Sequence, residues 1–216
     1  MEKKHTELVC ILDKSGSMSG LESDTIGGFN TLINNQKKEE GEVVVTTVLF
    51  DTYYTILHNR IPLKEVELLS EKDYTASGTT ALLDAVGSTI DHLSKHITQL
   101  EDLEYPAVLV VIITDGEENS SSKYTLKSVK KSIEFYKEHH TWEFIFLGAN
   151  IDAFQAAQNL GIARERASSY HADATGVNIN YDVLSQSVSK IRSGKCIDDK
   201  WKEKIEEDFK RRKKGN

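Results

Sequence analysis

The chain has 216 residues, of which 38% are hydrophobic and 28% are charged, and its formal net charge is −7. This composition excludes a disordered chain, and the negative balance argues against a nucleic-acid-binding surface. The two cysteines, Cys10 and Cys196, are too few for a disulfide framework or a cysteine-based metal site.

Apolar runs predict the strands of a mostly parallel sheet. Residues 8–12 and 108–113 are continuously apolar, which is typical of strands covered on both faces. Only Asp51 and Thr52 separate two further runs, too few for a parallel crossover, so those strands should form an antiparallel hairpin. The predicted strands are residues 8–12, 43–50, 53–57, 107–114 and 142–148, with a short edge strand at 166–170.

Apolar residues that recur every three or four positions predict helices between these strands. The clearest stripe runs from Leu82 to Ile97, and the serines at 120–122 can cap the helix that begins near residue 126. The final segment, 198–216, should form a terminal helix with a basic tail. The remaining stripes cover residues 26–33, 126–136, 151–160 and 177–191.

Strands that alternate with helices predict an α/β fold. We expect a three-layer α-β-α sandwich with a doubly wound, mostly parallel sheet and one antiparallel edge strand. No internal repeat or linker interrupts the chain, so residues 1–216 should form a single domain. In such a sheet, ligands bind beyond the carboxyl ends of the strands, where the strand order reverses.

The segment that follows the first strand carries small oxygen-bearing side chains on alternate positions: Asp13, Ser15 and Ser17. In an extended loop these side chains point to one side, and three such oxygens are typical of a site for a hard cation such as Mg2+ or Mn2+. The alternative is a turn whose Asp and Ser side chains only cap the next helix.

Asp115 follows the apolar run 110–114 and occupies the equivalent place on a later strand. In the doubly wound order that strand neighbours the first, at about 4.8 Å. Asp13 and Asp115 would then face one crevice, and two carboxylates sharing a site repel unless a cation or a proton neutralises them. A third loop, Ser77-Gly78-Thr79-Thr80, offers a hydroxyl at the same edge, although either Thr alone can be read as a helix cap.

Together the three segments closely resemble the von Willebrand factor type A domain, whose metal-ion-dependent adhesion site has the pattern D-x-S-x-S, a distant Thr and an Asp after a hydrophobic strand. The resemblance covers residues 6–191. It implies a Rossmann-like fold and one bound divalent cation, usually Mg2+, with Mn2+ or Ca2+ as alternatives. Thr79 is preferred to Thr80 because it directly follows Gly78. The implied metal ligands are Asp13, Ser15, Ser17, Thr79 and Asp115.

Other polar residues are interpreted as ordinary surface groups. His92 and His96 have helical ligand spacing but no accompanying zinc motif. Glu117 and Asn119 could support the metal ligands or line a partner surface, but the preferred interpretation is that they are solvated loop residues. The basic run 210–214 is read as a frayed helix end whose positive charge suits the helix C-terminus.

We therefore expect a non-enzymatic, metal-dependent protein-binding module, because no motif of a nucleophile or a phosphate loop is present. The resemblance implies that a partner protein presents an Asp or Glu to the metal. Without a signal peptide or a membrane-length apolar run, we expect a cytoplasmic protein that binds neither membrane nor nucleic acid.

Two alternatives remain open at this point. A Mg2+-dependent phosphohydrolase of haloacid-dehalogenase type also places an Asp after the first strand, but it needs a second acid where Ser15 stands. The other alternative is a structural subunit whose metal only ties the loops together.

Overall fold

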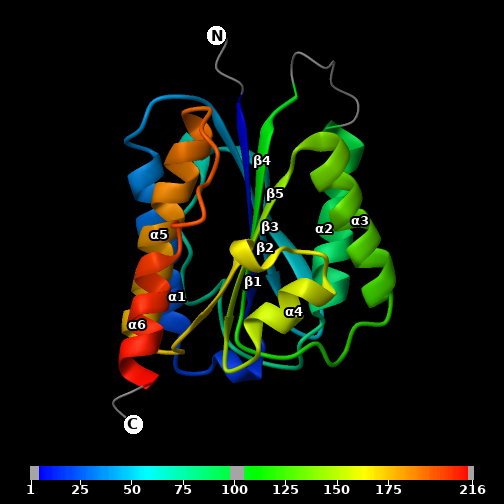
Figure 1. Cartoon of the computed structure of the whole chain (residues 1–216), viewed down its shortest axis with the longest axis vertical. Coiled ribbons are helices and arrows are strands. Elements are labelled where there is room, and N and C mark those ends of the chain that lie inside the picture. The colour runs from blue at the N-terminus through cyan, green and yellow to red at the C-terminus, as the bar shows by residue number, and fades with distance from the viewer. Residues whose placement is uncertain (1–4, 98–104, 214–216) are drawn as a thin grey trace.

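The computed structural model describes residues 5–97 and 105–213. Its centre is a six-stranded sheet in the order β3-β2-β1-β4-β5-β6, in which β2 and β3 pair antiparallel and the other pairs are parallel (Figure 1). The order reverses between β1 and β4, as the doubly wound prediction requires. The strands are β1 (Thr6–Asp13), β2 (Val43–Phe50), β3 (Tyr54–Pro62), β4 (Ala107–Thr114), β5 (Glu143–Ala149) and β6 (Ala167–Tyr170).

Helices cover both faces of the sheet, which confirms the three-layer sandwich (Figure 1). One layer holds α1 (Glu22–Gln36), α5 (Ala174–Arg192) and α6 (Glu203–Lys213). The opposite layer holds α2 (Leu82–Ile97), α3 (Leu126–His140) and α4 (Ala153–Asn159). Short 3₁₀ turns lie at Gly16–Met18, Leu63–Glu65 and Arg164–Arg166. Among the described helices, none is long and apolar enough to cross a membrane.

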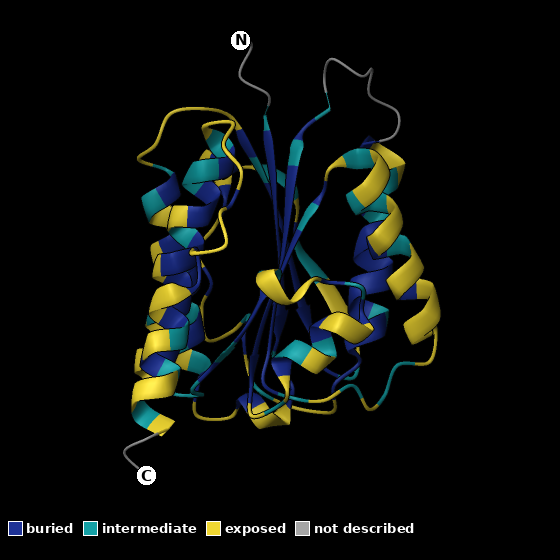
Figure 2. Cartoon of the chain, viewed as in Figure 1, coloured by how far each residue is buried: buried dark blue, intermediate teal, exposed yellow. Residues whose placement is uncertain are grey.

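Two apolar cores result from the alternation of side chains along β1. Leu8, Cys10 and Leu12 pack under α1 and α5, whereas Val9 and Ile11 pack under α2 and α3. All residues of β1 are buried, and Figure 2 shows the central strands dark blue between helices with exposed outer faces. Burial on both faces explains why the first strand is continuously apolar in sequence.

Several predicted boundaries differ from the structure. The third strand continues past residue 57 to Pro62. Its second half is polar, which an edge strand tolerates, so the pattern of apolar runs did not include it. Thr125, not the serines at 120–122, caps α3, through a reciprocal capping box with Ser128. The terminal helix begins at Glu203 rather than at residue 198, and the end of the predicted tail, 214–216, lies outside the described residues.

The packing of α1 on α5 depends on a glycine. A Cβ atom at Gly28 would lie 2.1 Å from the Tyr181 ring, whereas a Cβ at the neighbouring Gly27 would meet nothing within 4 Å. Gly28 therefore permits the close approach of the two helices, and Gly27 serves no packing role.

We predict that Gly28→Ala lowers the free energy of unfolding by about 1–3 kcal/mol, because the new methyl group forces α1 away from Tyr181. The matched Gly27→Ala variant should raise the same quantity by about 0.5–1 kcal/mol, since Ala is the better helix former. Urea denaturation of both variants measures the effect, and two changes of the same sign would contradict this account of the helix contact.

Candidate metal centre

Asp13 and Asp115 emerge side by side at the carboxyl edge of the sheet. Strands β1 and β4 are parallel neighbours, and their pairing runs up to Leu12 opposite Ile113. The last residue of β4 also connects this strand to the end of β1: the Thr114 hydroxyl donates a hydrogen bond of 2.5 Å to Asp13 Oδ2. The structure thus places both predicted carboxylates at the same edge of the sheet, at the ends of neighbouring strands.

The first loop connects the two carboxylates through its hydroxyl groups. The Ser15 backbone N–H donates to Asp13 Oδ1 at 2.7 Å, and the Ser15 and Ser17 hydroxyls lie 3.0 Å apart. The Ser17 hydroxyl then donates to Asp115 Oδ1 at 2.6 Å. Four of the predicted ligand residues therefore belong to one continuous polar network, formed by the expected alternation along the loop.

Backbone contacts fix this loop against the rest of the rim. The Gly16 N–H donates to the Gly78 carbonyl at 3.1 Å, and the Ser77 N–H donates to the Lys14 carbonyl at 2.9 Å. The Lys14 ammonium forms an ion pair with Asp51 at the end of β2, so its charge is directed away from the two carboxylates. Buried Tyr74 donates its hydroxyl to the Asp13 carbonyl.

The third loop brings the hydroxyl of Thr80, rather than that of Thr79, to the neighbourhood of Ser17. Thr79 is exposed, and its hydroxyl lies 2.9 Å from that of Thr52. Thr80 is 3% exposed, and a Cβ atom at Gly116 would lie 2.8 Å from its Oγ1 and 3.1 Å from Ser17 Oγ. The Thr80 and Ser17 hydroxyls therefore border the same small space, which stays open because residue 116 is a glycine.

The loop after β4 contributes two supporting residues, Asn119, which the sequence offered as one possibility, and Glu118, which it did not single out. Asn119 Oδ1 accepts a hydrogen bond of 2.9 Å from the Thr80 N–H, and the Asn119 N–H donates to the Thr80 carbonyl at 3.1 Å. Glu118 accepts from the Leu83 N–H at the start of α2, at 2.8 Å. Asn119 and Glu117 are both exposed, as expected for loop residues, and Asn119 in addition holds the backbone of Thr80.

Burial makes the two carboxylates electrostatically costly. Asp13 is 1% and Asp115 3% exposed. Burial raises the pKa of Asp13, and the Asp115 charge adds to this effect, whereas hydrogen bonds from Thr114 and Ser15 oppose it. Burial also raises the pKa of Asp115, and the hydrogen bond from Ser17 opposes this effect. Among the described residues, no ion pair involves either aspartate.

One oxygen of this pair has no partner in the described part of the chain. Asp115 Oδ2 is buried and accepts no hydrogen bond. An orphaned carboxylate oxygen beside a second carboxylate and three hydroxyls fits a small, hard divalent cation. No cluster of three or more His, Cys, Asp or Glu occurs in residues 5–97 and 105–213, so hydroxyl groups would have to complete any metal shell at this rim.

The other polar residues singled out in the sequence take structural positions away from this rim. The His92 Nε2 atom lies 2.7 Å from Asn59 Oδ1, and the His96 Nδ1 atom lies 2.9 Å from the His92 carbonyl oxygen. In the terminal basic run, Arg212 pairs with Asp173 and Asp208. The described part of that run is therefore docked rather than frayed.

No protein-family model and no curated protein matches the chain, but solved structures match its fold. Manganese-loaded TRAP from Plasmodium vivax superposes with a TM-score of 0.54 at 19% identity, over 82% of this chain and 72% of that one. A von Willebrand factor type A protein from Catenulispora acidiphila gives 0.54 at 12% identity, over 84% and 42%. The chain has the von Willebrand factor type A fold.

A third match is proximal thread matrix protein 1 from the mussel byssus, solved with a zinc-occupied MIDAS motif. Its TM-score is 0.55 at 13% identity, and the match covers 87% of this chain and 45% of that one. The chain thus spans less than half the length of two of these three von Willebrand factor type A structures. Identities this low establish the shared fold and leave the ligand set of this chain a prediction.

The raised carboxyl pKa values predict how stability depends on pH in the absence of metal. For both groups the folded-state pKa lies above the ordinary value of 3.8, so between 3.8 and the raised pKa the folded state binds more protons than the unfolded chain. Stability of the metal-free protein should therefore fall as the pH rises from 3.8 through the raised values.

We predict that Asp115→Asn raises the melting temperature of the metal-free protein at pH 7 by about 2–4 °C, equivalent to about 1 kcal/mol. The substitution removes one of two buried like charges, and a neutral amide group takes the place of the carboxylate whose Oδ2 atom has no hydrogen-bond partner. Asp13→Asn is the control: both Asp13 oxygens accept hydrogen bonds, so its gain should be smaller. Calorimetry in EDTA measures both, and destabilisation by Asp115→Asn would refute the proposed repulsion.

Proposed function

We propose that this chain is a non-enzymatic, divalent-metal-dependent protein-binding module that holds an acidic side chain of its partner through the metal. The observation that carries the proposal is the buried, partnerless Asp115 Oδ2 beside Asp13, in a network of hydroxyl groups. A cation at this place would neutralise two carboxylates whose pKa values burial raises.

The proposed ligands are Asp13, Ser15, Ser17 and Asp115, completed by a hydroxyl of the third loop. The sequence pattern favours Thr79 for that position, whereas the side-chain placement favours Thr80, whose hydroxyl borders the same space as Ser17. All these donors are oxygens, which suits Mg2+, and Mn2+ or Ca2+ use the same donor type. The metal-loaded states of TRAP and of proximal thread matrix protein 1, with manganese and zinc, support a divalent ion on this fold.

The charge of the proposed metal ligands favours the binding of a carboxylate from the partner. Two carboxylates and neutral hydroxyls balance a divalent ion without adding excess negative charge, so the ion keeps its affinity for one more anionic oxygen. Ser17 and Glu117 are exposed, which means that the rim is accessible to another protein. When bound, the metal would supply Lewis-acid attraction for that carboxylate, and the loops would hold its orientation.

The rim favours binding over catalysis. In the phosphohydrolase alternative, a second acid would occupy position 15, but here the Ser15 hydroxyl lies against Ser17. Lys14, the nearest cationic side chain in the loop, is paired with Asp51. Mg2+-dependent turnover of a chromogenic phosphomonoester, lost in Asp13→Asn, would favour the enzyme instead.

We predict that isothermal titration with Mg2+ shows one site in the unmodified protein and none in Asp13→Ala, because the substitution removes one of the two charged ligands. Thr80→Ala should weaken Mg2+ binding at least about tenfold, whereas Thr79→Ala should change it less than about threefold. Equal Mg2+ binding by the unmodified protein and Asp13→Ala would refute the metal site. The reverse order of the two Thr variants would restore Thr79 as the ligand.

We further predict that the protein captures peptides from a random library with a fixed central Asp, in Mg2+ but not in EDTA. A matched library with a fixed central Asn should give no Mg2+-dependent capture when both libraries have amidated C-termini and no Asp or Glu at their random positions, because an amide offers the metal no charge. Sequencing the captured peptides measures both. A metal that stabilises the fold while both libraries behave alike would support the structural-subunit alternative.

A further inference from the structure

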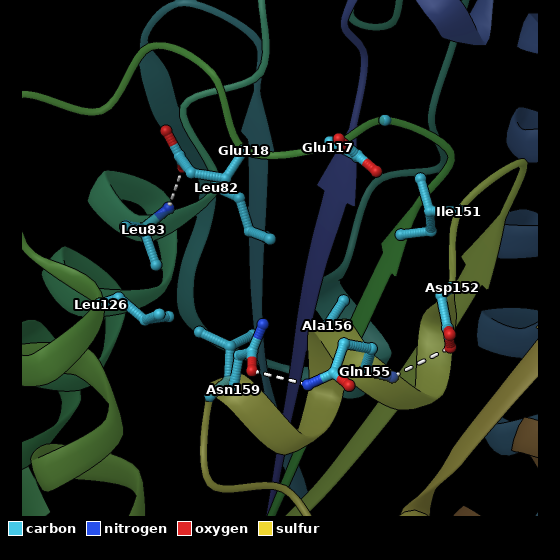
Figure 3. Close-up of a pocket in the computed structure, with 12 residues that line it drawn as sticks. Leu82, Leu83, Glu117, Glu118, Leu126, Ile151, Asp152, Gln155, Ala156 and Asn159 are labelled. Carbon is cyan, nitrogen blue, oxygen red and sulfur yellow. Dashed lines mark hydrogen bonds between the residues drawn. The ribbon is translucent and has the colours of Figure 1, made fainter.

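A pocket of ≈ 330 Å³ opens beside the proposed metal rim (Figure 3). Its walls come from the start of α2, the loop after β4, the start of α3, and α4 with the loop before it. In Figure 3 the labelled side chains surround an open centre, with the leucines on one side and Ile151 on the other. The apolar lining residues are Leu82, Leu83, Leu126, Ile151, Ala156 and Leu160.

The pocket adjoins the proposed metal site at the residues that follow Asp115. Gly116 and Glu117 line the pocket, and Gly116 also borders the Thr80 and Ser17 hydroxyls. A peptide with a carboxylate at the metal would therefore cross Gly116 and place its next side chain over the pocket. A larger residue at position 116 would close this path, because its Cβ atom would lie 2.8 Å from Thr80 Oγ1.

Glu118, Asp152 and Gln155 of the lining form hydrogen bonds within the protein. Glu118 accepts from the Leu83 N–H at 2.8 Å, and Asp152 accepts from the Gln155 N–H at 3.0 Å. The Gln155 side chain donates to Asn159 at 2.9 Å. The pocket therefore offers a ligand mainly apolar surface. Leu126 contributes to this surface and is 43% exposed.

The charged residues of the pocket lining determine which kind of side chain the pocket can accept. The charged side chains of the lining are Glu117, Glu118 and Asp152, all acidic. They would repel a second carboxylate, so the acidic residue of a partner is directed to the metal and a neutral apolar side chain to the pocket. The volume and lining suit one aliphatic side chain with its backbone.

We propose that this pocket receives an aliphatic side chain next to the metal-bound acidic residue, so that the partner carries a short motif of Asp or Glu beside Leu, Ile or Met. This inference rests on the proposed function and adds the specificity that a metal-bound carboxylate lacks. The metal holds the charge of the partner, and the pocket distinguishes one acidic segment from another.

The fixed-Asp library supplies the test, because its captured peptides should be enriched in Leu, Ile or Met beside the Asp. Two synthetic peptides that differ only by Leu or Ala at the enriched position should then differ about tenfold or more in affinity for the Mg2+-loaded protein. That ratio is expected for the burial of one aliphatic side chain. Isothermal titration of each peptide measures it.

Variants of the pocket separate this proposal from the metal site. Ala156→Phe should fill the pocket and abolish the Leu-to-Ala difference, while Mg2+ affinity stays unchanged. Leu126→Ser, at an exposed position, is a second variant that should reduce the difference without threatening the fold. The matched control is Gln158→Phe, which adds the same ring to α4 outside the lining and should preserve the full difference.

The outcomes are distinct. Mg2+-dependent capture of Asp peptides without an aliphatic preference, or with a preference that survives both pocket variants, overturns the pocket proposal and leaves the proposed function standing. Absence of Mg2+ binding, or equal capture by the Asp and Asn libraries, overturns the proposed function and the pocket proposal with it. An aliphatic preference that only the pocket variants lose supports both.

Discussion

The Asp13 and Asp115 carboxylates lie buried at the ends of adjacent parallel strands, and the architecture of the rim follows from this constraint. Like charges held together in a low-dielectric site destabilise the fold unless something neutralises them. The chain supplies hydroxyl and N–H donors from Thr114, Ser15 and Ser17, which leave one Asp115 oxygen without a partner. This incomplete compensation is the feature on which the proposal of a cation site at this edge of the sheet rests.

The three loops share the task of holding that arrangement. The first and third loops are joined by two backbone hydrogen bonds, and the third is joined to the loop after β4 through Asn119 and Thr80. Each loop therefore orders another, so that the hydroxyl groups are positioned before any ligand arrives. Preorganised donors lower the entropic cost of binding, which matters for an ion that gives up part of its hydration shell.

Much of the fold could be predicted from sequence because the decisive strands are buried on both faces. Continuous apolar runs mark β1 and β4, and the residue after each run had to emerge at the carboxyl edge. The choice between Thr79 and Thr80 could not be predicted, because Gly78 adopts a φ of +70° and this turn decides which hydroxyl faces inward. The pocket was also hidden, since its lining comes from separate segments whose apolar residues resemble ordinary core positions.

A carboxylate-binding metal alone gives little discrimination, since any exposed Asp or Glu satisfies it, so specificity has to come from the surface around the ion. On one side of the rim, Lys14 and Asp51 neutralise each other. On the other side, Gly116 opens onto an apolar pocket with an acidic border. The β4 loop contributes to both features, because Asp115 belongs to the proposed ion site and Gly116 and Glu117 line the pocket. A shift of that loop on metal binding would move the pocket wall as well, and would thereby couple charge recognition to apolar recognition through one short segment.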